Sequence, residues 1–249
     1  MLNLNPFAAP TFKPGSAVSM PVVYFEDFIG GYTAVDLALA NESDPTGLIS
    51  PVADRGVWFV SHDALVADTQ LFAPQDDADG GWIKATTDAT SGERISMQIN
   101  GEPFLLGLGR TLYYEARLKF TNTTQDAFFG LAVNTTDPHA SAPSDYVAFG
   151  LTGDADIEVG VALASSDGGA FSGTDSTIDL VANTWTTFAF MYDGVDTVRF
   201  YVDGAEAGAK STNVPIGKFM SPVFCVESNG AAEAMFIDYV LVANERARP

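Results

Sequence analysis

Two aspartate-glycine pairs in the C-terminal third of the chain restrict its fold more than any other feature. Both lie in the segment Trp185–Gly208, where Asp193-Gly194 and Asp203-Gly204 each follow an apolar stretch. Asp-Gly after an apolar stretch predicts a tight turn between antiparallel strands, because glycine adopts the required positive φ without steric cost. The segment is therefore predicted to consist of two strands with turns at these pairs.

The residues between the two turns alternate between apolar and polar side chains. Val198, Phe200 and Val202 share one face, while Arg199 and Tyr201 share the other, as expected of a strand buried on one side. Comparable apolar or alternating stretches recur at short intervals, at residues 22–28, 95–99, 113–120, 128–133, 146–151, 157–163, 222–227 and 235–242. No crossover helix is predicted between them, so we expect an all-β fold, a two-sheet antiparallel sandwich.

The N-terminal stretch differs from the rest of the chain. Residues 1–21 contain four prolines, whose fixed φ and missing N–H exclude a helix and favour extended backbone. Its apolar side chains Leu4, Phe7 and Phe12 are the candidates for contact with a capsid or another partner. The predicted organisation is an extended N-terminal arm over 1–21, a sandwich over 22–245 and a C-terminal tail over 246–249.

The hairpin segment resembles a motif of the concanavalin A-like lectin/glucanase jelly rolls, the laminin-G-like group included. The motif is W-x-x-(apolar)-x-(apolar)-x-Y-D-G followed by Y-V-D-G, present here within Trp185–Gly208. V-Y-F-E-D-F at 23–28 and F-I-D-Y-V-L-V at 236–242 fit the strands that this family pairs near its termini. The resemblance implies a jelly-roll fold for about residues 22–245. It implies little about function, since the fold hosts lectins, hydrolases, lyases and structural proteins.

The chain is also similar in general character to jelly-roll proteins of tailed bacteriophages. The likeness lies in a start without a secretory signal, the proline-rich arm, the acidic balance and D-Y-V-A-F-G-L at 145–151. It implies a non-enzymatic virion structural protein, a capsid decoration or cement subunit made in the host cytoplasm and placed on the capsid surface. The implied partners are the major capsid protein or another virion protein, and further copies of the chain in a homo-oligomer.

Charge and hydropathy exclude two classes of partner. The chain has 12 Lys+Arg against 32 Asp+Glu, a net charge of −20, so its surface repels phosphate backbones and nucleic-acid binding is not expected. No stretch approaches the roughly 20 apolar residues that a membrane-spanning helix requires. The sequence therefore predicts neither a nucleic-acid nor a membrane partner.

One acidic segment resembles the catalytic strand of the glucanase members. They carry three carboxylates at alternate positions of one strand that lines a cleft, and Asp154, Asp156 and Glu158 have that spacing. The first is Asp rather than the longer Glu, and the segment lies between two apolar strands, as a turn does. We predict a solvated turn and no catalytic residue, with a glycoside hydrolase or lyase using Glu158 as the alternative. The single cysteine, Cys225, is predicted to pack as a small buried hydrophobe.

Aromatic side chains on the predicted polar faces suggest a second function. Trp82, Tyr113 and Tyr201 could stack on sugar rings, which would make the chain a lectin-like carbohydrate-binding module for attachment to a host or other surface glycan. The competing interpretation is that they pack under loops or against the other sheet.

An aspartate-rich segment at residues 75–81 is the only candidate for a metal. Asp77 and Asp79 precede a glycine pair, but the segment departs from the EF-hand pattern at its first and last ligand positions. A surface turn is predicted here. No cofactor is expected, apart from a structural Ca²⁺ to which these two carboxylates could contribute.

Overall fold

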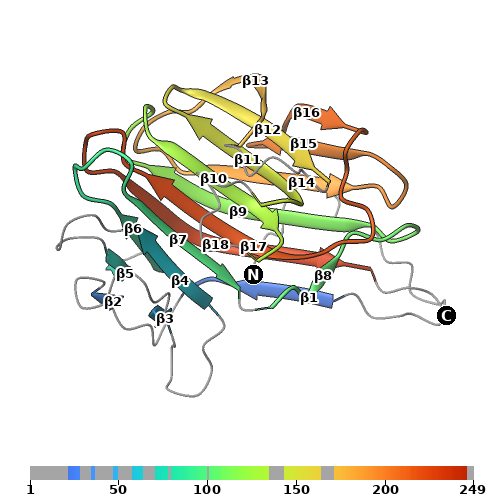
Figure 1. The fold of residues 1–249 in the computed structure, drawn as a ribbon, viewed down its shortest axis with the longest axis horizontal. Coiled ribbons are helices and arrows are strands. Elements are labelled where there is room, and N and C mark those ends of the chain that lie inside the picture. The colour runs from blue at the N-terminus through green and yellow to red at the C-terminus, as the bar shows by residue number, and fades with distance from the viewer. Residues whose placement is uncertain are drawn as a thin grey trace.

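The computed structural model describes residues 22–28, 35–36, 47–49, 58–63, 71–77, 80–99, 101–134, 143–163 and 171–245. Every element in these residues is a strand, and the strands form two stacked antiparallel sheets (Figure 1). The predicted all-β sandwich is confirmed. The arm over 1–21, with Leu4, Phe7 and Phe12, and the tail over 246–249 lie outside the described residues, so their roles stay predictions.

Sheet 1 contains the hairpin segment and both terminal strands. Its order is β16 (Ala205–Lys210), β15 (Val198–Val202), β14 (Thr186–Tyr192), β9 (Leu112–Phe120), β18 (Ala234–Asn244), β6 (Gly80–Thr86), β5 (Leu71–Asp77) and β2 (Val35–Asp36). Strand β1 (Val22–Glu26) pairs with the C-terminal half of β18, and β6 pairs with its N-terminal half. Strands β1 and β6 therefore share one side of β18.

Sheet 2 packs against sheet 1. Its order is β13 (Thr174–Asp179), β12 (Asp156–Ala162), β11 (Tyr146–Thr152), β10 (Asp126–Ala132), β17 (Phe219–Glu227), β7 (Arg94–Ile99), β4 (Trp58–Asp63) and β3 (Gly47–Ile49), with β8 (Phe104–Leu105) beside the start of β17. Across the parts of the chain that the structure describes, no helix has the length and apolar character needed to cross a bilayer.

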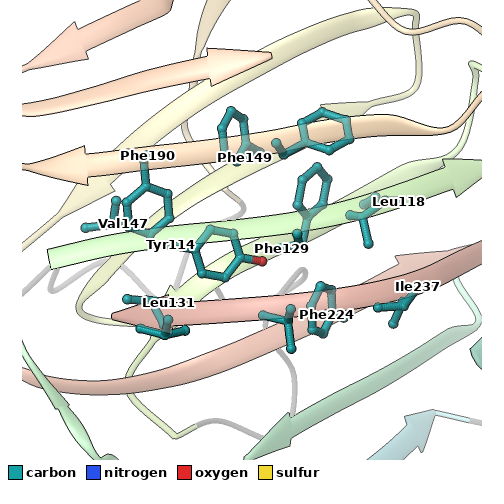
Figure 2. Close-up of a cluster of buried hydrophobic side chains, with 14 of the residues drawn as sticks. Tyr114, Leu118, Phe129, Leu131, Val147, Phe149, Phe190, Phe224 and Ile237 are labelled. Carbon is teal, nitrogen blue, oxygen red and sulfur yellow. The ribbon is translucent and has the colours of Figure 1, made fainter. Parts of the chain in front are cut away.

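Aromatic rings dominate the core between the sheets (Figure 2). In sheet 1, Tyr114 and Phe190 stack with ring centroids 4.7 Å apart, and in sheet 2 Phe129 stacks on Phe149 at 5.6 Å. Phe149 of sheet 2 meets Phe200 of sheet 1 edge to face at 5.3 Å. Each fully buried side chain of this size contributes about 1.5–3 kcal/mol through the area removed from water, so these rings hold the two sheets together.

The second aspartate-glycine pair forms the predicted two-residue turn. Asp203 and Gly204 both have positive φ, 46° and 84°, the conformation of the hairpin turns that match the twist of paired strands. The Asp203 carboxylate accepts a hydrogen bond of 2.8 Å from the amide of Thr187. This turn joins β15 to β16, so the segment predicted as two strands also contains the start of a third.

The first aspartate-glycine pair begins a longer loop, between the end of β14 and the start of β15. One carboxylate oxygen of Asp193 accepts hydrogen bonds from the amides of Val195, Asp196 and Thr197 at 2.8, 3.1 and 3.1 Å. Desolvation raises the pKa of Asp193, but these bonds outweigh it and bring the pKa below its ordinary value. The aspartate thus organises the loop in its ionised form.

Candidate functional site

Strand β9 places four polar side chains on the outer face of sheet 1, the surface that points away from the core. Tyr113, Glu115, Arg117 and Lys119 alternate along β9 with fully buried residues, which confirms the alternating stretch predicted at 113–120. Arg117 and Lys119 are half-buried, and Glu115 is only 8% exposed. Neighbouring side chains therefore cover this row of charge in part.

A lysine-phenylalanine-lysine row crosses three strands of this face. In the strand register, Phe236 of β18 pairs with Lys84 of β6 on one side and with Lys119 of β9 on the other. The Lys119 Nζ lies 4.5 Å from the centroid of the Phe236 ring, and the Lys84 Nζ lies 5.7 Å from it. Neither ammonium forms an ion pair with a residue that the structure describes. Each cation–π contact contributes about 0.5–1 kcal/mol at a partly exposed site.

Two tryptophans approach each other above this row. Trp82 lies on β6 and Trp185 directly precedes β14, and β18 and β9 separate these strands. Their ring centroids are nevertheless 6.3 Å apart in an edge-to-face contact, and Trp82 also meets Phe236 edge to face at 5.0 Å. The Lys119 Nζ lies 4.7 Å from the Trp185 ring and 5.2 Å from the Trp82 ring. Three half-buried aromatic rings thus surround one ammonium.

We refer to Trp82, Trp185, Phe236, Lys84 and Lys119 as the Trp82–Trp185 cluster. A β-bulge brings an ion pair beside it: the register of β9 with β18 shifts around Asp238, the extra residue on β18. Asp238 lies 2.7 Å from Arg117 Nη1, and the Arg117 guanidinium lies 5.2 Å from the Trp185 ring. Arg117 is therefore held between a carboxylate and an indole.

A carboxylate with two tyrosine partners lies further along β9. Glu115 accepts hydrogen bonds from the hydroxyl of Tyr113 and, at 2.8 Å, from that of Tyr239. Burial, reinforced by the Glu115 charge, raises the pKa of both tyrosines above the ordinary value. Both hydroxyls therefore stay protonated at physiological pH and donate to the carboxylate.

Strand β1 adds an apolar edge to the same face. Its side chains alternate, and Val23 and Phe25 point outward with 56% and 51% of their surface exposed. The Phe25 ring packs against Tyr239, with centroids 5.9 Å apart. Among the described strands, β1 pairs only with β18, and no other described strand lies along its second edge. Exposed apolar side chains on an edge strand are typical of a contact surface.

An aromatic side chain covers part of the outer face of sheet 2. The ring of Phe171 is buried above Gly150 and Gly160, where an added Cβ would lie 2.1 and 2.8 Å from ring carbons. Phe128 and Tyr146 contact the same ring at centroid distances of 5.6 and 5.7 Å. These residues form a second apolar cluster, which also contains the buried Cys225, as predicted for that thiol.

The acidic segment between β11 and β12 forms a turn, as the sequence predicted. Strand β11 ends at Thr152 and β12 begins at Asp156, which leaves Asp154 exposed in the turn. Glu158 accepts a hydrogen bond of 3.1 Å from the Thr152 hydroxyl. Its Cβ lies 2.5 Å from the position that a Cβ on Gly173 would occupy. Gly173 thus packs directly on Glu158, and only two of the three carboxylates lie on a strand.

Mutual repulsion dominates the electrostatics of this turn. The charge of Asp154 raises the pKa of Asp156 most, followed by that of Asp175, with a smaller contribution from Asp179. Nearby carboxylates disfavour one another's ionisation. The charged form of Asp156 is therefore less stable in the folded protein than in the unfolded chain.

Sequence comparison identifies the family. A family model described as the concanavalin A-like lectin/glucanases superfamily, of the laminin G type, matches residues 105–236, just over half of the chain. The chain belongs to the concanavalin A-like lectin/glucanase superfamily. No curated protein matches the chain in sequence.

Solved structures share the sandwich at low sequence identity. An endo-1,3-β-glucanase from Streptomyces sioyaensis is 16% identical, with 94% of this chain and 99% of that chain covered and a TM-score of 0.53. A seed lectin of Lotus tetragonolobus is 12% identical, with 79% and 96% covered and a TM-score of 0.53. A Shewanella oneidensis protein of unknown function is 13% identical, with 94% and 92% covered and a TM-score of 0.53. Such identities show a common fold alone.

The three predicted sugar-stacking residues all lie half-buried on the outer face of sheet 1, but not together. Trp82 belongs to the Trp82–Trp185 cluster, and Tyr113 is bonded to Glu115. Tyr201 lies on β15, separated from β9 by β14. The predicted residues therefore do not form a single platform on this superfamily fold.

The sequence did not indicate which residues contact Trp82. Trp185 and Phe236 stand at outward positions of strands whose alternation could have been read. Alternation alone does not indicate which strands are neighbours, so the contact of Trp185 and Phe236 with Trp82 could not be predicted from the sequence.

The metal prediction stays untested. The aspartate-rich segment forms the hairpin of β5 and β6, in which Asp77 pairs with Gly80. The Asp77 side chain and all of Asp79 lie outside the described residues. Within the residues described, no three His, Cys, Asp or Glu side chains gather in a way that could hold a metal ion.

Proposed function

We propose that the chain is a non-enzymatic virion structural protein of the capsid-decoration type, which binds the shell through the β1 edge of sheet 1. The observation that supports this most is the exposure of Val23 and Phe25, 56% and 51%. They lie directly after the proline-rich stretch 1–21, so one continuous segment would supply both the arm and the docking strand. The partner would be the major capsid protein or another virion protein on the capsid surface.

Weak contacts suffice for such a role when many copies act together. Each copy would contribute a small apolar contact. In a homo-oligomer or on a symmetric shell, the high effective concentration of further contacts would raise the overall affinity. The acidic charge of −20 keeps the free protein soluble before assembly in the host cytoplasm.

A binding rather than catalytic role is supported by the outer face of sheet 2. Phe171 occupies the space above Gly150 and Gly160, and Gly173 packs on Glu158. A glycosidase of this superfamily would instead need carboxylates beside a cleft open to a sugar chain.

Two phenylalanines allow a matched test of the docking edge. Phe25 on β1 and Phe219 at the start of β17 are 51% and 52% exposed, but they lie on different sheets. We expect Phe25→Ser to reduce incorporation into particles at least about tenfold, and Phe219→Ser to leave it unchanged. Equal incorporation of both variants would contradict docking through β1.

Carbohydrate binding is a second candidate, and the Trp82–Trp185 cluster favours it. Half-buried indoles on an outer sheet face are suited to stacking on sugar rings, and the structural neighbours include a seed lectin and a glucanase. On a glycan array, we expect binding that Trp185→Ala abolishes and Phe25→Ser retains. Absence of binding to every glycan on the array would remove this candidate.

A further inference from the structure

The two lysines of the Trp82–Trp185 cluster have different surroundings from the described cations that are paired with carboxylates. Arg117 is paired with Asp238, Arg199 with Glu206 and Lys218 with Asp145. Lys84 and Lys119 face aromatic rings instead, and no carboxylate in the described residues neutralises them. In a chain with 32 acidic residues and 12 basic ones, two neighbouring lysines without an ion pair among the described residues form a local positive site.

We propose that the Trp82–Trp185 cluster is a subsite for an acidic sugar, a residue of the uronic-acid class within a glycan chain. The proposal rests on the carbohydrate-binding function above and specifies its ligand. The sugar ring stacks on an indole of the cluster, and its carboxylate pairs with the ammonium of Lys119 or Lys84.

Charge complementarity selects an anionic ligand at this position. With a net charge of −20, most of the surface repels an anionic chain, and the neighbouring cations Lys84 and Lys119 give such a ligand a place to bind. Lys84 and Lys119 are separated by one strand, which places their backbones about 9.6 Å apart, two inter-strand spacings. Carboxylates on either side of the Phe236 ring can thus each meet a lysine.

The aromatic rings select a sugar rather than an acidic peptide. A pyranose ring has a flat C–H face that covers an indole, whereas a glutamate or aspartate side chain has none. Arg117 lies against Trp185 and is paired with Asp238. The guanidinium can donate hydrogen bonds to sugar hydroxyls, and the carboxylate can accept hydrogen bonds from them. Charged hydrogen bonds of this kind orient a ligand as well as bind it.

The test compares tetragalacturonate with its full methyl ester, since the two differ in charge but not in ring structure. By calorimetry at low ionic strength, we expect the acid to bind about tenfold more tightly than the ester. Lys119→Gln should weaken binding of the acid several-fold, Lys84→Gln less, and added salt should weaken it further. Arg199→Gln is the matched control, because Arg199 lies on the same outer face but is paired with Glu206, and it should leave binding unchanged.

Three other results would contradict the acidic-sugar assignment. If the acid and the ester bind with equal affinity, and Lys119→Gln binds the acid as tightly as Arg199→Gln does, the acidic-sugar assignment is overturned while carbohydrate binding stands. If neither the acid, the ester nor neutral oligosaccharides bind, both the carbohydrate function and the acidic-sugar assignment are wrong. Polyglutamate is the control for acidic polymers in general. If it binds as tightly as tetragalacturonate, and binds Trp185→Ala equally well, the sugar assignment is overturned.

Discussion

The two outer faces of the sandwich use aromatic residues in opposite ways. On sheet 2, Phe171 lies over Gly150 and Gly160, buried among apolar neighbours. On sheet 1, Trp82 and Trp185 remain half-buried and enclose a charged ammonium. The first arrangement removes apolar area from water. The second keeps aromatic surface and charge accessible.

On the proposed function, the covered patch of sheet 2 serves stability and the outer face of sheet 1 serves binding. Where glycines let a ring approach the sheet closely, substitutions should change stability. Where rings are held by cations and by each other, substitutions should change binding with little effect on stability. Three variants test this contrast and a fourth tests the acidic turn between β11 and β12. Their expected effects on the free energy of unfolding decrease from the first to the last.

The largest effect is expected for Phe171→Ala on sheet 2. Removal of a buried phenyl ring costs both its transfer free energy and the cavity left behind, about 3 kcal/mol, and Phe171 is only 6% exposed. Urea denaturation measures this loss as a lower midpoint. A loss below about 1 kcal/mol would show that the Phe171 ring does not cover sheet 2 as described.

Gly150→Ala should destabilise the protein by about 2 kcal/mol, because the new Cβ overlaps the Phe171 ring and the ring must move. In the Phe171→Ala background the same substitution should cost much less, since the overlapping ring is gone. The two losses should therefore not add in a double-mutant cycle. Simple additivity would contradict the close contact between the glycine and the ring.

Trp185→Ala on sheet 1 should cost only about 1 kcal/mol of stability, the scale of one or two partly exposed cation–π contacts. Its effect on glycan binding should be a complete loss. Urea denaturation and calorimetry on the same preparation measure both quantities. A stability loss equal to that of Phe171→Ala, without a change in binding, would make the cluster a structural feature like the one on sheet 2.

Asp156→Asn should stabilise the protein slightly, the smallest and only favourable change. Because neighbouring carboxylates raise the pKa of Asp156 in the folded state, its ionisation opposes folding at neutral pH. The gain should disappear as the pH falls below the ordinary aspartate pKa of about 3.9, where the group is protonated in both states. Thermal unfolding at pH 7 and pH 3 measures it, and high salt should reduce it at pH 7. A gain that is independent of pH would contradict the electrostatic cause.

The sequence was sufficient to predict the faces of strands but not their neighbours. Alternation assigned Tyr113, Glu115, Arg117 and Lys119 to one face of β9, and the structure confirms it. The tight turn at Asp203 followed from glycine and aspartate chemistry, whereas the hairpin at Asp193 has a longer loop than the tight turn predicted.

Features that depend on contact between distant segments were not predictable. Trp82 and Trp185 converge only because β6 and β14 flank the pair formed by β18 and β9. The bulge that places Asp238 beside Arg117 inserts one residue without a glycine or proline to mark it. Gly150 and Gly160 were a missed signal, since glycine within an apolar strand often marks the close approach of another group.

The central claim is that sheet 1 provides the contact surface of this protein and sheet 2 does not. Hydroxyl-radical footprinting of the protein, free and bound to virions, tests it directly, because Phe25 and Phe219 begin with nearly equal exposure, 51% and 52%. We predict that binding protects Phe25 several-fold and leaves the oxidation rate of Phe219 unchanged. Protection of Phe219 with Phe25 unaffected would contradict the account.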